Sequence, residues 1–166
     1  MDTYLPANPE LALLVRLLDE AYSRKAWHGP NLRGSIRGVT AEEAAWRPAA
    51  KRHCIAELVT HAAYWKYAVR RKLVGADRGS FALKGSNWFP IARRLDSEAW
   101  AGSVRLLDGE HRTLREAVLA LNPRDLNKKP SATRYTRVAL IQGITAHDLY
   151  HAGQIQLLKR LRRGSG

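Results

Sequence analysis

The chain of 166 residues has little of what marks secreted and membrane proteins. It contains a single cysteine, Cys54, so no disulfide can form within the chain, and a reducing cytoplasm fits that usage. No run of about eighteen apolar residues occurs, which excludes a membrane-spanning helix of ordinary length. The first residues, Met1 to Pro6, lack the basic and apolar regions of a signal peptide. We therefore expect a cytoplasmic protein in which residues 1–166 form one domain.

Acidic residues are also scarce. Asp and Glu number 15 against 28 Lys and Arg, so the formal net charge is +13 at pH 7. Such a balance favours an anionic partner, for example nucleic acid, acidic lipid or an anionic substrate. The basic residues are nevertheless scattered, with short clusters only at 70–72 and 159–163, and no nucleic-acid-binding motif accompanies them. We expect no specific nucleic acid partner, and a non-catalytic basic module that binds an anionic partner stays open as an alternative function.

Neither the period-two alternation of β-strands nor an internal repeat is visible in the sequence. Apolar residues instead recur at spacings of three and four, which is typical of a helix with one buried face. A capping box, Thr40 with Glu43, opens a short additional helix, and Ser97 is the expected N-cap of a long one. The sequence thus predicts an all-α four-helix bundle with short extra helices in its connections. The four long helices are expected at residues 9–25, 53–73, 97–121 and 136–162.

The segment 75–94 between the second and third long helices is irregular, because three glycines and Pro90 interrupt it. It also contains three aromatic residues, Phe81, Trp88 and Phe89. An irregular connection of this length in a compact domain is either functional or mobile. Because of its aromatic side chains, we expect this segment to pack over the mouth of a site.

Two histidines, His147 and His151, stand four residues apart on the fourth predicted helix. Side chains at this spacing lie on one face, about 6 Å apart along the helix axis, so both imidazoles can reach one metal ion. The pair shares its row with apolar residues, which places it on the buried side: Leu140, Ile144 and Leu158. On the second predicted helix, His61 also lies on the apolar stripe and faces the interior, where it is either a third ligand or a hydrogen-bonded core residue.

Three histidine ligands would leave one coordination position open, which is the pattern of a catalytic metal site. Water in that position would have a lowered pKa and could attack a substrate, or a substrate thiolate could be held there as a nucleophile. Imidazole ligation suits zinc, nickel, iron and copper and does not choose among them. As the cofactor we expect zinc or nickel, with iron or manganese as alternatives.

The same segment reads His-Asp-x-x-His, one methylene short of the metalloprotease motif His-Glu-x-x-His. In that interpretation Asp148 is a general base. The fifteen residues after His151 contain no His, Asp or Glu, so the downstream third ligand of those proteases is absent. We therefore expect Asp148 to orient a ligand imidazole or to pair with a nearby Arg or Lys.

Four further residues have alternative roles. Cys54 could be a nucleophile, but no His–Asp arrangement is readable around it, and a structural or helix-capping position is expected. His111 faces inward on the third long helix, and we expect a core residue rather than a fourth ligand. Trp27 and His28 precede Gly29 and Pro30 in a turn, where they either line a pocket or anchor a packed loop.

Motifs spread from residue 26 to residue 154 resemble those of the DinB-like superfamily of metal-dependent enzymes. The motifs are Ala26-Trp27-His28-Gly29-Pro30, Trp46-Arg-Pro48, Ile55-Ala-Glu-Leu-Val-Thr-His61-Ala-Ala-Tyr-Trp65 and His147-Asp148-Leu-Tyr150-His151-Ala-Gly153-Gln154. The resemblance implies an up-down-down-up four-helix bundle, a homodimer, and a divalent metal held by His61, His147 and His151. In one departure, Cys54 stands where the superfamily often has Ser, which puts the cap of that helix in doubt.

The resemblance also implies a reaction. Some members of the superfamily look like thiol S-transferases or isomerases that use bacterial low-molecular-weight thiols, and others are described as hydrolases. We expect an enzyme that activates a small thiol or water against a small-molecule electrophile. Asp148 and Gln154 are expected to orient the ligands, and Trp27 and His28 to line the pocket wall. A bundle whose three histidines are vestigial and whose role is dimerisation is the remaining alternative.

Overall fold

The computed structural model describes residues 6–76, 79–131 and 133–164, and within these ranges the chain forms helices and connections without a strand. The predicted all-α class is confirmed. None of the described helices combines the length and the apolar character needed to cross a membrane. The long helices are α1 (Pro9–Tyr22), α4 (Ile55–Val74), α5 (Ser97–Leu119) and α6 (Arg137–Gly164). The short helices in the connections are α2 (Leu32–Ser35), α3 (Ala41–Ala45) and the 3-10 helix η1 (Pro123–Asp125).

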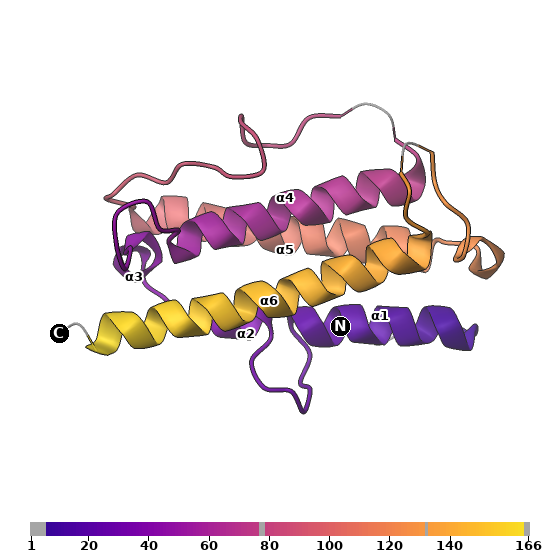
Figure 1. Cartoon of the computed structure of the whole chain (residues 1–166), viewed down its shortest axis with the longest axis horizontal. Helices are drawn as coiled ribbons and strands as arrows, with labels where there is room; N and C mark the ends of the chain where they lie inside the picture. The colour runs from indigo at the N-terminus through magenta and orange to yellow at the C-terminus, as the bar shows by residue number, and fades with distance from the viewer. Residues whose placement is uncertain (1–5, 77–78, 132, 165–166) are drawn as a thin grey trace.

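The long helices pack side by side, with α4 in contact with both α5 and α6, and α1 in contact with both α5 and α6. The connection after α4 runs back along the molecule, so α5 begins near the end at which α4 begins (Figure 1). Helix α6 then runs in the direction opposite to α4, and its C-terminal end lies near the start of α4. The middle of α4 therefore faces the middle of α6.

Side-chain caps fix where the helices begin. The predicted capping box is present, because the Thr40 hydroxyl accepts from the N–H of Glu43 and the Glu43 carboxylate accepts from the N–H of Thr40. The N-cap expected at Ser97 is wrong by one residue: the Asp96 carboxylate accepts from the N–H of Ala99, and Ser97 is already helical. A carboxylate also interacts favourably with the positive end of the helix dipole, which explains this start.

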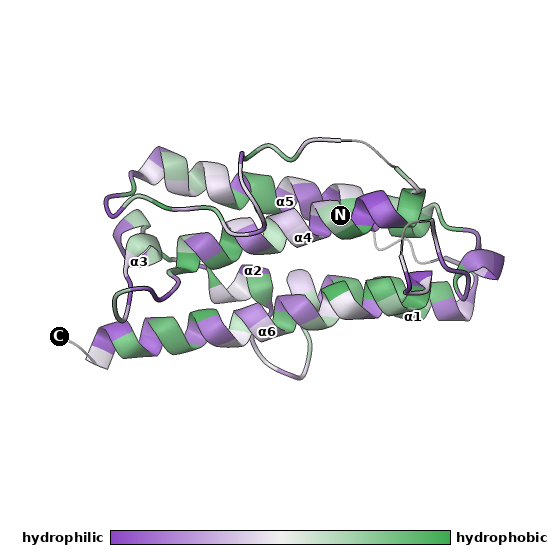
Figure 2. Cartoon of the chain, turned by 45° about the horizontal axis from the view of Figure 1, so that its top comes forward, coloured by the Kyte–Doolittle hydropathy of each residue, from purple (hydrophilic) through white to green (hydrophobic). Residues whose placement is uncertain are grey.

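The core consists of two apolar clusters with a polar layer between them. On α6, one cluster ends at Ile144 and the other begins at Ile155. Buried polar side chains lie between the clusters on three helices: Lys66 on α4, His111 on α5, and Asp148 and His151 on α6. Figure 2 shows the corresponding mixture of hydrophobic and hydrophilic residues along α4 and α6. The bundle thus carries titratable groups in its interior, half-way along its length.

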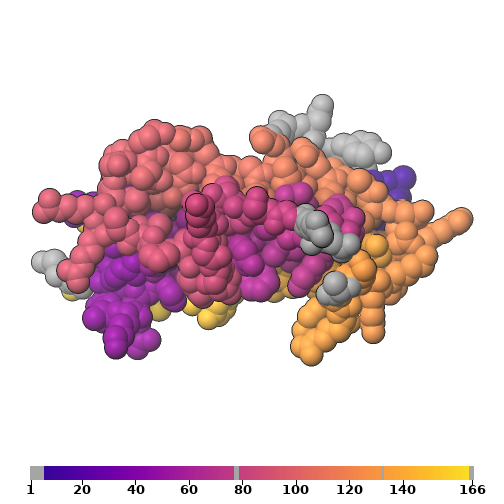
Figure 3. Space-filling model, turned by 90° about the horizontal axis from the view of Figure 1, so that it is seen from above, coloured from indigo at the N-terminus to yellow at the C-terminus, as the bar shows by residue number. Residues whose placement is uncertain are grey.

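The irregular connection between α4 and α5 packs onto the bundle, as its aromatic residues predict. Phe81 and Phe89 contact the Tyr64 ring, with centroid distances of 5.5 and 5.9 Å. The Trp88 indole stacks on the His61 imidazole at 3.8 Å. In the space-filling view, the connection lies over α4 in the half of the molecule that contains α3 (Figure 3). A segment that forms no helix in its described residues thereby supplies groups to the region between α4 and α6.

Candidate metal centre

Three histidines from two antiparallel helices converge between α4 and α6. The Nε2 atom of His147 lies 3.3 Å from Nε2 of His61 and 3.1 Å from Nε2 of His151. Together the three residues offer ligand atoms that all lie within 4.8 Å of one another. Two nitrogens bound to one tetrahedral zinc at about 2.0–2.1 Å would be roughly 3.3 Å apart, so the observed spacing fits a shared ion. The fold therefore brings together the three histidines that the sequence singled out.

Hydrogen bonds at the outer nitrogens turn two of these imidazoles toward the centre. Nδ1 of His61 donates to the backbone carbonyl of Asn87 at 2.7 Å, and Nδ1 of His151 donates to Oε1 of Gln154 at 2.7 Å. A carbonyl oxygen only accepts, so each neutral ring carries its proton on Nδ1 and keeps a lone pair on Nε2. Metal-binding histidines are held in this way. Gln154 thus occupies a position from which it orients His151.

The inward-facing nitrogens carry at most one proton among them. With Nε2 of His61 and His151 unprotonated, only Nε2 of His147 can donate, and it donates to one neighbour at a time. The outer nitrogen of His147, Nδ1, is buried and has no hydrogen-bond partner within the described part of the chain. Lone pairs held this close in a buried site repel one another unless a cation lies between them. The donor set therefore fits a divalent metal ion of the kind that imidazole binds.

Burial keeps the three imidazoles neutral. It lowers the pKa of His147 to about 3 and the pKa of His151 to about 4, and the neighbouring imidazoles add to the effect. Burial also lowers the pKa of His61. Because a neutral imidazole is the form that binds a metal ion, protons do not compete for these nitrogens near pH 7.

We expect the metal-free protein to lose stability as the pH falls from about 6.5 toward 4. In the unfolded chain, His147 and His151 bind protons near their ordinary pKa of 6.5, whereas the folded protein binds them only near pH 3 to 4. In this window the unfolded state holds more protons, so the free energy of unfolding decreases as the pH is lowered. Urea unfolding at a series of pH values measures the effect.

A His147→Gln/His151→Gln variant is the matched control for this pH dependence. Its free energy of unfolding should change less between pH 6.5 and 4, because two titrating groups are gone while every carboxylate remains. The same pH dependence in both proteins would contradict the prediction.

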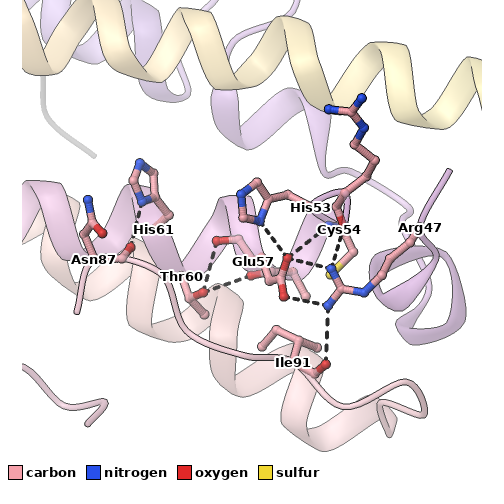
Figure 4. Close-up of polar contacts among 10 residues, drawn as sticks. Arg47, His53, Cys54, Glu57, Thr60, His61, Asn87 and Ile91 are labelled. Carbon is pink, nitrogen blue, oxygen red and sulfur yellow. Dashed lines mark hydrogen bonds and ion pairs between the residues drawn. The ribbon is translucent and has the colours of Figure 1, made fainter. Parts of the chain in front are cut away.

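One side of the centre is bounded by a column of stacked rings. Trp88 lies between His61 and His53, with ring centroids 3.8 and 3.7 Å away. Nδ1 of His53 donates to the Glu57 carboxylate at 2.9 Å, and Arg47 holds the same carboxylate with hydrogen bonds of 2.5 and 2.7 Å (Figure 4). Burial alone would raise the pKa of Glu57, but these bonds hold it at about 2, so Glu57 stays ionised.

The spacing of His53 and Glu57 along the sequence indicates their position near His61, although the apolar period of the helix does not include them. His53, Glu57 and His61 follow one another at intervals of four residues. Glu57 and His61 share one face of α4, and His53 lies two residues before the helix begins. Asn87 had no such signal, because it acts through its backbone carbonyl, which every residue possesses.

The Asp148 side chain lies in the polar layer of the core. Its carboxylate forms an ion pair with the Lys66 ammonium, and both side chains are completely buried. Nζ of Lys66 also lies 3.4 Å from Nδ1 of His111 and 4.8 Å from the centre of the Tyr22 ring. Of the two roles open for Asp148, the structure shows the ion pair and not a bond to a ligand imidazole. His111 is buried in the same layer, where it stacks on Tyr22 as a core residue.

The structure does not bring Trp27 and His28 to the three histidines. The Trp27 side chain is 98% exposed. His28 lines a separate hollow together with Gly153 and Arg160 of α6. Those two positions lie roughly opposite His151 around the helix, so the hollow is on the far side of α6 from the centre.

Cys54 occupies the N-cap position of α4, where the Glu57 carboxylate accepts from its N–H at 3.4 Å. The side chain is buried, and burial raises the pKa of its thiol. A buried thiol with a raised pKa is a poor nucleophile. The position therefore agrees with the structural role expected for Cys54.

Comparison with known proteins adds to this geometry. A family model described as the DinB superfamily matches residues 25–155. No curated protein and no solved structure gives a significant match. The matched range includes all three converging histidines and extends over well more than half of the sequence. On this match, and with its helical fold and three-histidine cluster, the chain belongs to the DinB superfamily.

Proposed function

We propose that the protein is a metal-dependent enzyme that activates a small thiol or a water molecule against a small-molecule electrophile. The observation that carries the proposal is the convergence of imidazole nitrogens from His61, His147 and His151 at 3.1 and 3.3 Å. A divalent ion held by three protein ligands supplies Lewis acidity and one open position for a substrate. Zinc or nickel is the proposed cofactor, with iron or manganese next.

The residues of the chain have separate tasks in this proposal. The three histidines bind the ion through Nε2. Asn87 and Gln154 accept the outer protons of two ligands and so fix the direction of their lone pairs. Trp88 covers the face of His61 and supports its ring by stacking.

We expect protein purified without chelator to contain one divalent ion per chain, and to turn over an electrophile only when this ion is present. Elemental analysis by plasma mass spectrometry measures the metal. Transfer is assayed with 1-chloro-2,4-dinitrobenzene and a panel of low-molecular-weight thiols, and hydrolysis with 4-nitrophenyl acetate alone.

Three outcomes of these assays are distinguishable. Turnover that needs both metal and thiol supports a transferase, and metal-dependent turnover without thiol supports a hydrolase. Protein that binds the ion but turns over neither probe above the chelated control would contradict the enzymatic proposal while leaving the metal centre intact.

A further inference from the structure

His53 stands beside the three-histidine centre without belonging to it. It lies eight residues before the ligand His61 and two residues before α4 begins, with Glu57 of the first helical turn between them. The His53 side chain is 49% exposed, whereas His61 is buried. His53 is therefore an imidazole at the N-terminal end of α4 that is partly open to solvent.

Hydrogen bonding fixes the tautomer of the neutral His53 ring. Glu57 is ionised and only accepts, so the bond of 2.9 Å places a proton on Nδ1 of His53. The Glu57 carboxylate is itself held by Arg47 and by the N–H of Cys54. Nε2 of His53 has no hydrogen-bond partner among the residues that the structure describes. A neutral His53 consequently presents a free lone pair on Nε2, as a general base requires.

Stacking also fixes where the His53 ring lies. The Trp88 indole separates the His53 and His61 rings by two stacking intervals, 3.7 and 3.8 Å, with interplanar angles of 6° and 13°. Figure 4 shows the His61 imidazole on α4 and the His53 imidazole beside the start of α4, both on the side that faces α6. The intervening indole prevents His53 from joining the three ligands directly. A small molecule held at the centre would meet His53 where it extends past the edge of the indole.

We propose that His53 is the proton-transfer residue of the centre, with Glu57 as the carboxylate that orients it. As the nucleophile, a thiol or water, forms its bond to the electrophile, its proton passes to Nε2 of His53. The bond to the leaving group breaks, and the leaving group departs with the electron pair of that bond. The resulting imidazolium donates through Nδ1 to Glu57, and it later returns the proton to the leaving group or to solvent. The inference rests on the proposed function, and it adds a catalytic residue to that function.

A purely structural role for His53 predicts different results for its variants. In that case the ring would only support Trp88 by stacking, and phenylalanine would replace it. We expect His53→Phe to keep one metal ion per chain and to lower the turnover of the active probe by about 100-fold or more. Arg52→Ala changes the adjacent exposed side chain, which makes no side-chain hydrogen bond within the described residues, and should leave turnover unchanged.

Chemical rescue tests the proton transfer itself. His53→Ala leaves a ring-sized space on the Trp88 indole, so imidazole added to the buffer should restore turnover in proportion to its concentration. Rescue of His53→Ala together with the loss in His53→Phe supports the proposal. Wild-type turnover in His53→Phe would overturn it.

A readout independent of turnover uses the imidazole nitrogens. Nitrogen-15 NMR of the metal-free protein should show Nδ1 of His53 protonated and Nε2 unprotonated, and Glu57→Gln should disturb this preference. Added cobalt(II) should broaden the His53 ring resonances, because the ring lies close to the centre, while His28 stays sharp. The opposite tautomer, or unbroadened His53 resonances with the cobalt bound, would overturn the proposal even if neither probe is turned over.

Discussion

Replacing His151 with alanine is expected to weaken zinc binding by about 100-fold or more. A protein zinc site is worth roughly 10–16 kcal/mol, so one ligand of a four-coordinate ion accounts for about 3 kcal/mol. His151 is one of the three proposed ligands, and its nitrogen lies 3.1 Å from that of His147. Competition with a chromogenic chelator measures the dissociation constant. The zinc-induced rise in melting temperature, which follows the ratio of zinc concentration to dissociation constant, should disappear in parallel.

Replacing Gln154, which orients His151, should have a smaller effect on zinc affinity than replacing His151 itself. Gln154→Ala should weaken zinc binding by about 10- to 100-fold, because groups that hold a ligand imidazole contribute on that scale. Gln142→Ala alters an exposed glutamine on the same helix and should have no effect. Unchanged zinc affinity in His151→Ala would remove the basis for a metal centre at this position.

Replacing Lys66 with methionine is expected to destabilise the fold by about 3–5 kcal/mol. The substitution leaves the Asp148 carboxylate completely buried without its cation, and an uncompensated buried charge costs that much. Total stabilities of domains are about 5–15 kcal/mol, so the loss is a large fraction of the whole. Urea unfolding of the zinc-free protein measures it, with Lys72→Met on the same helix as the control.

Removing both charges should restore most of this loss. In Lys66→Met/Asp148→Leu the new side chains approximate the shapes of the old ones, and a buried ion pair replaced by apolar residues is often neutral or stabilising. The double variant should therefore be more stable than Lys66→Met alone. If the double variant loses as much as the two single variants together, the two side chains do not act as a pair.

Helix positions followed from the sequence because the information is local. Helix α4 was expected at 53–73 and is Ile55–Val74, and α6 was expected at 136–162 and is Arg137–Gly164. The period of apolar residues reports the buried face of each helix directly. The ends differed by a few residues, since a cap depends on single hydrogen bonds such as that of Asp96.

The interior polar groups were harder to predict. Lys66 lies four residues after Ala62 and three before Val69, on the apolar stripe of α4, but a lysine in a stripe also fits a partly exposed position. Only the packing of α4 against α6 shows that Asp148 meets Lys66 and not a ligand imidazole. The partner of a buried charge depends on the register between two helices, which no local pattern contains.

The sequence by itself determined the helical class and the pair His147 and His151, because the hydrogen bonding within a helix fixes which residues share a face. The tertiary structure decided what completes that pair. It brings His61, which is 86 positions from His147 in the sequence, next to the pair. It also places the irregular connection so that the Asn87 carbonyl accepts a hydrogen bond from His61 and the Trp88 indole stacks on the His61 ring. These neighbours are set by how whole helices and loops pack around a common core, and that packing is a property of all the side chains together.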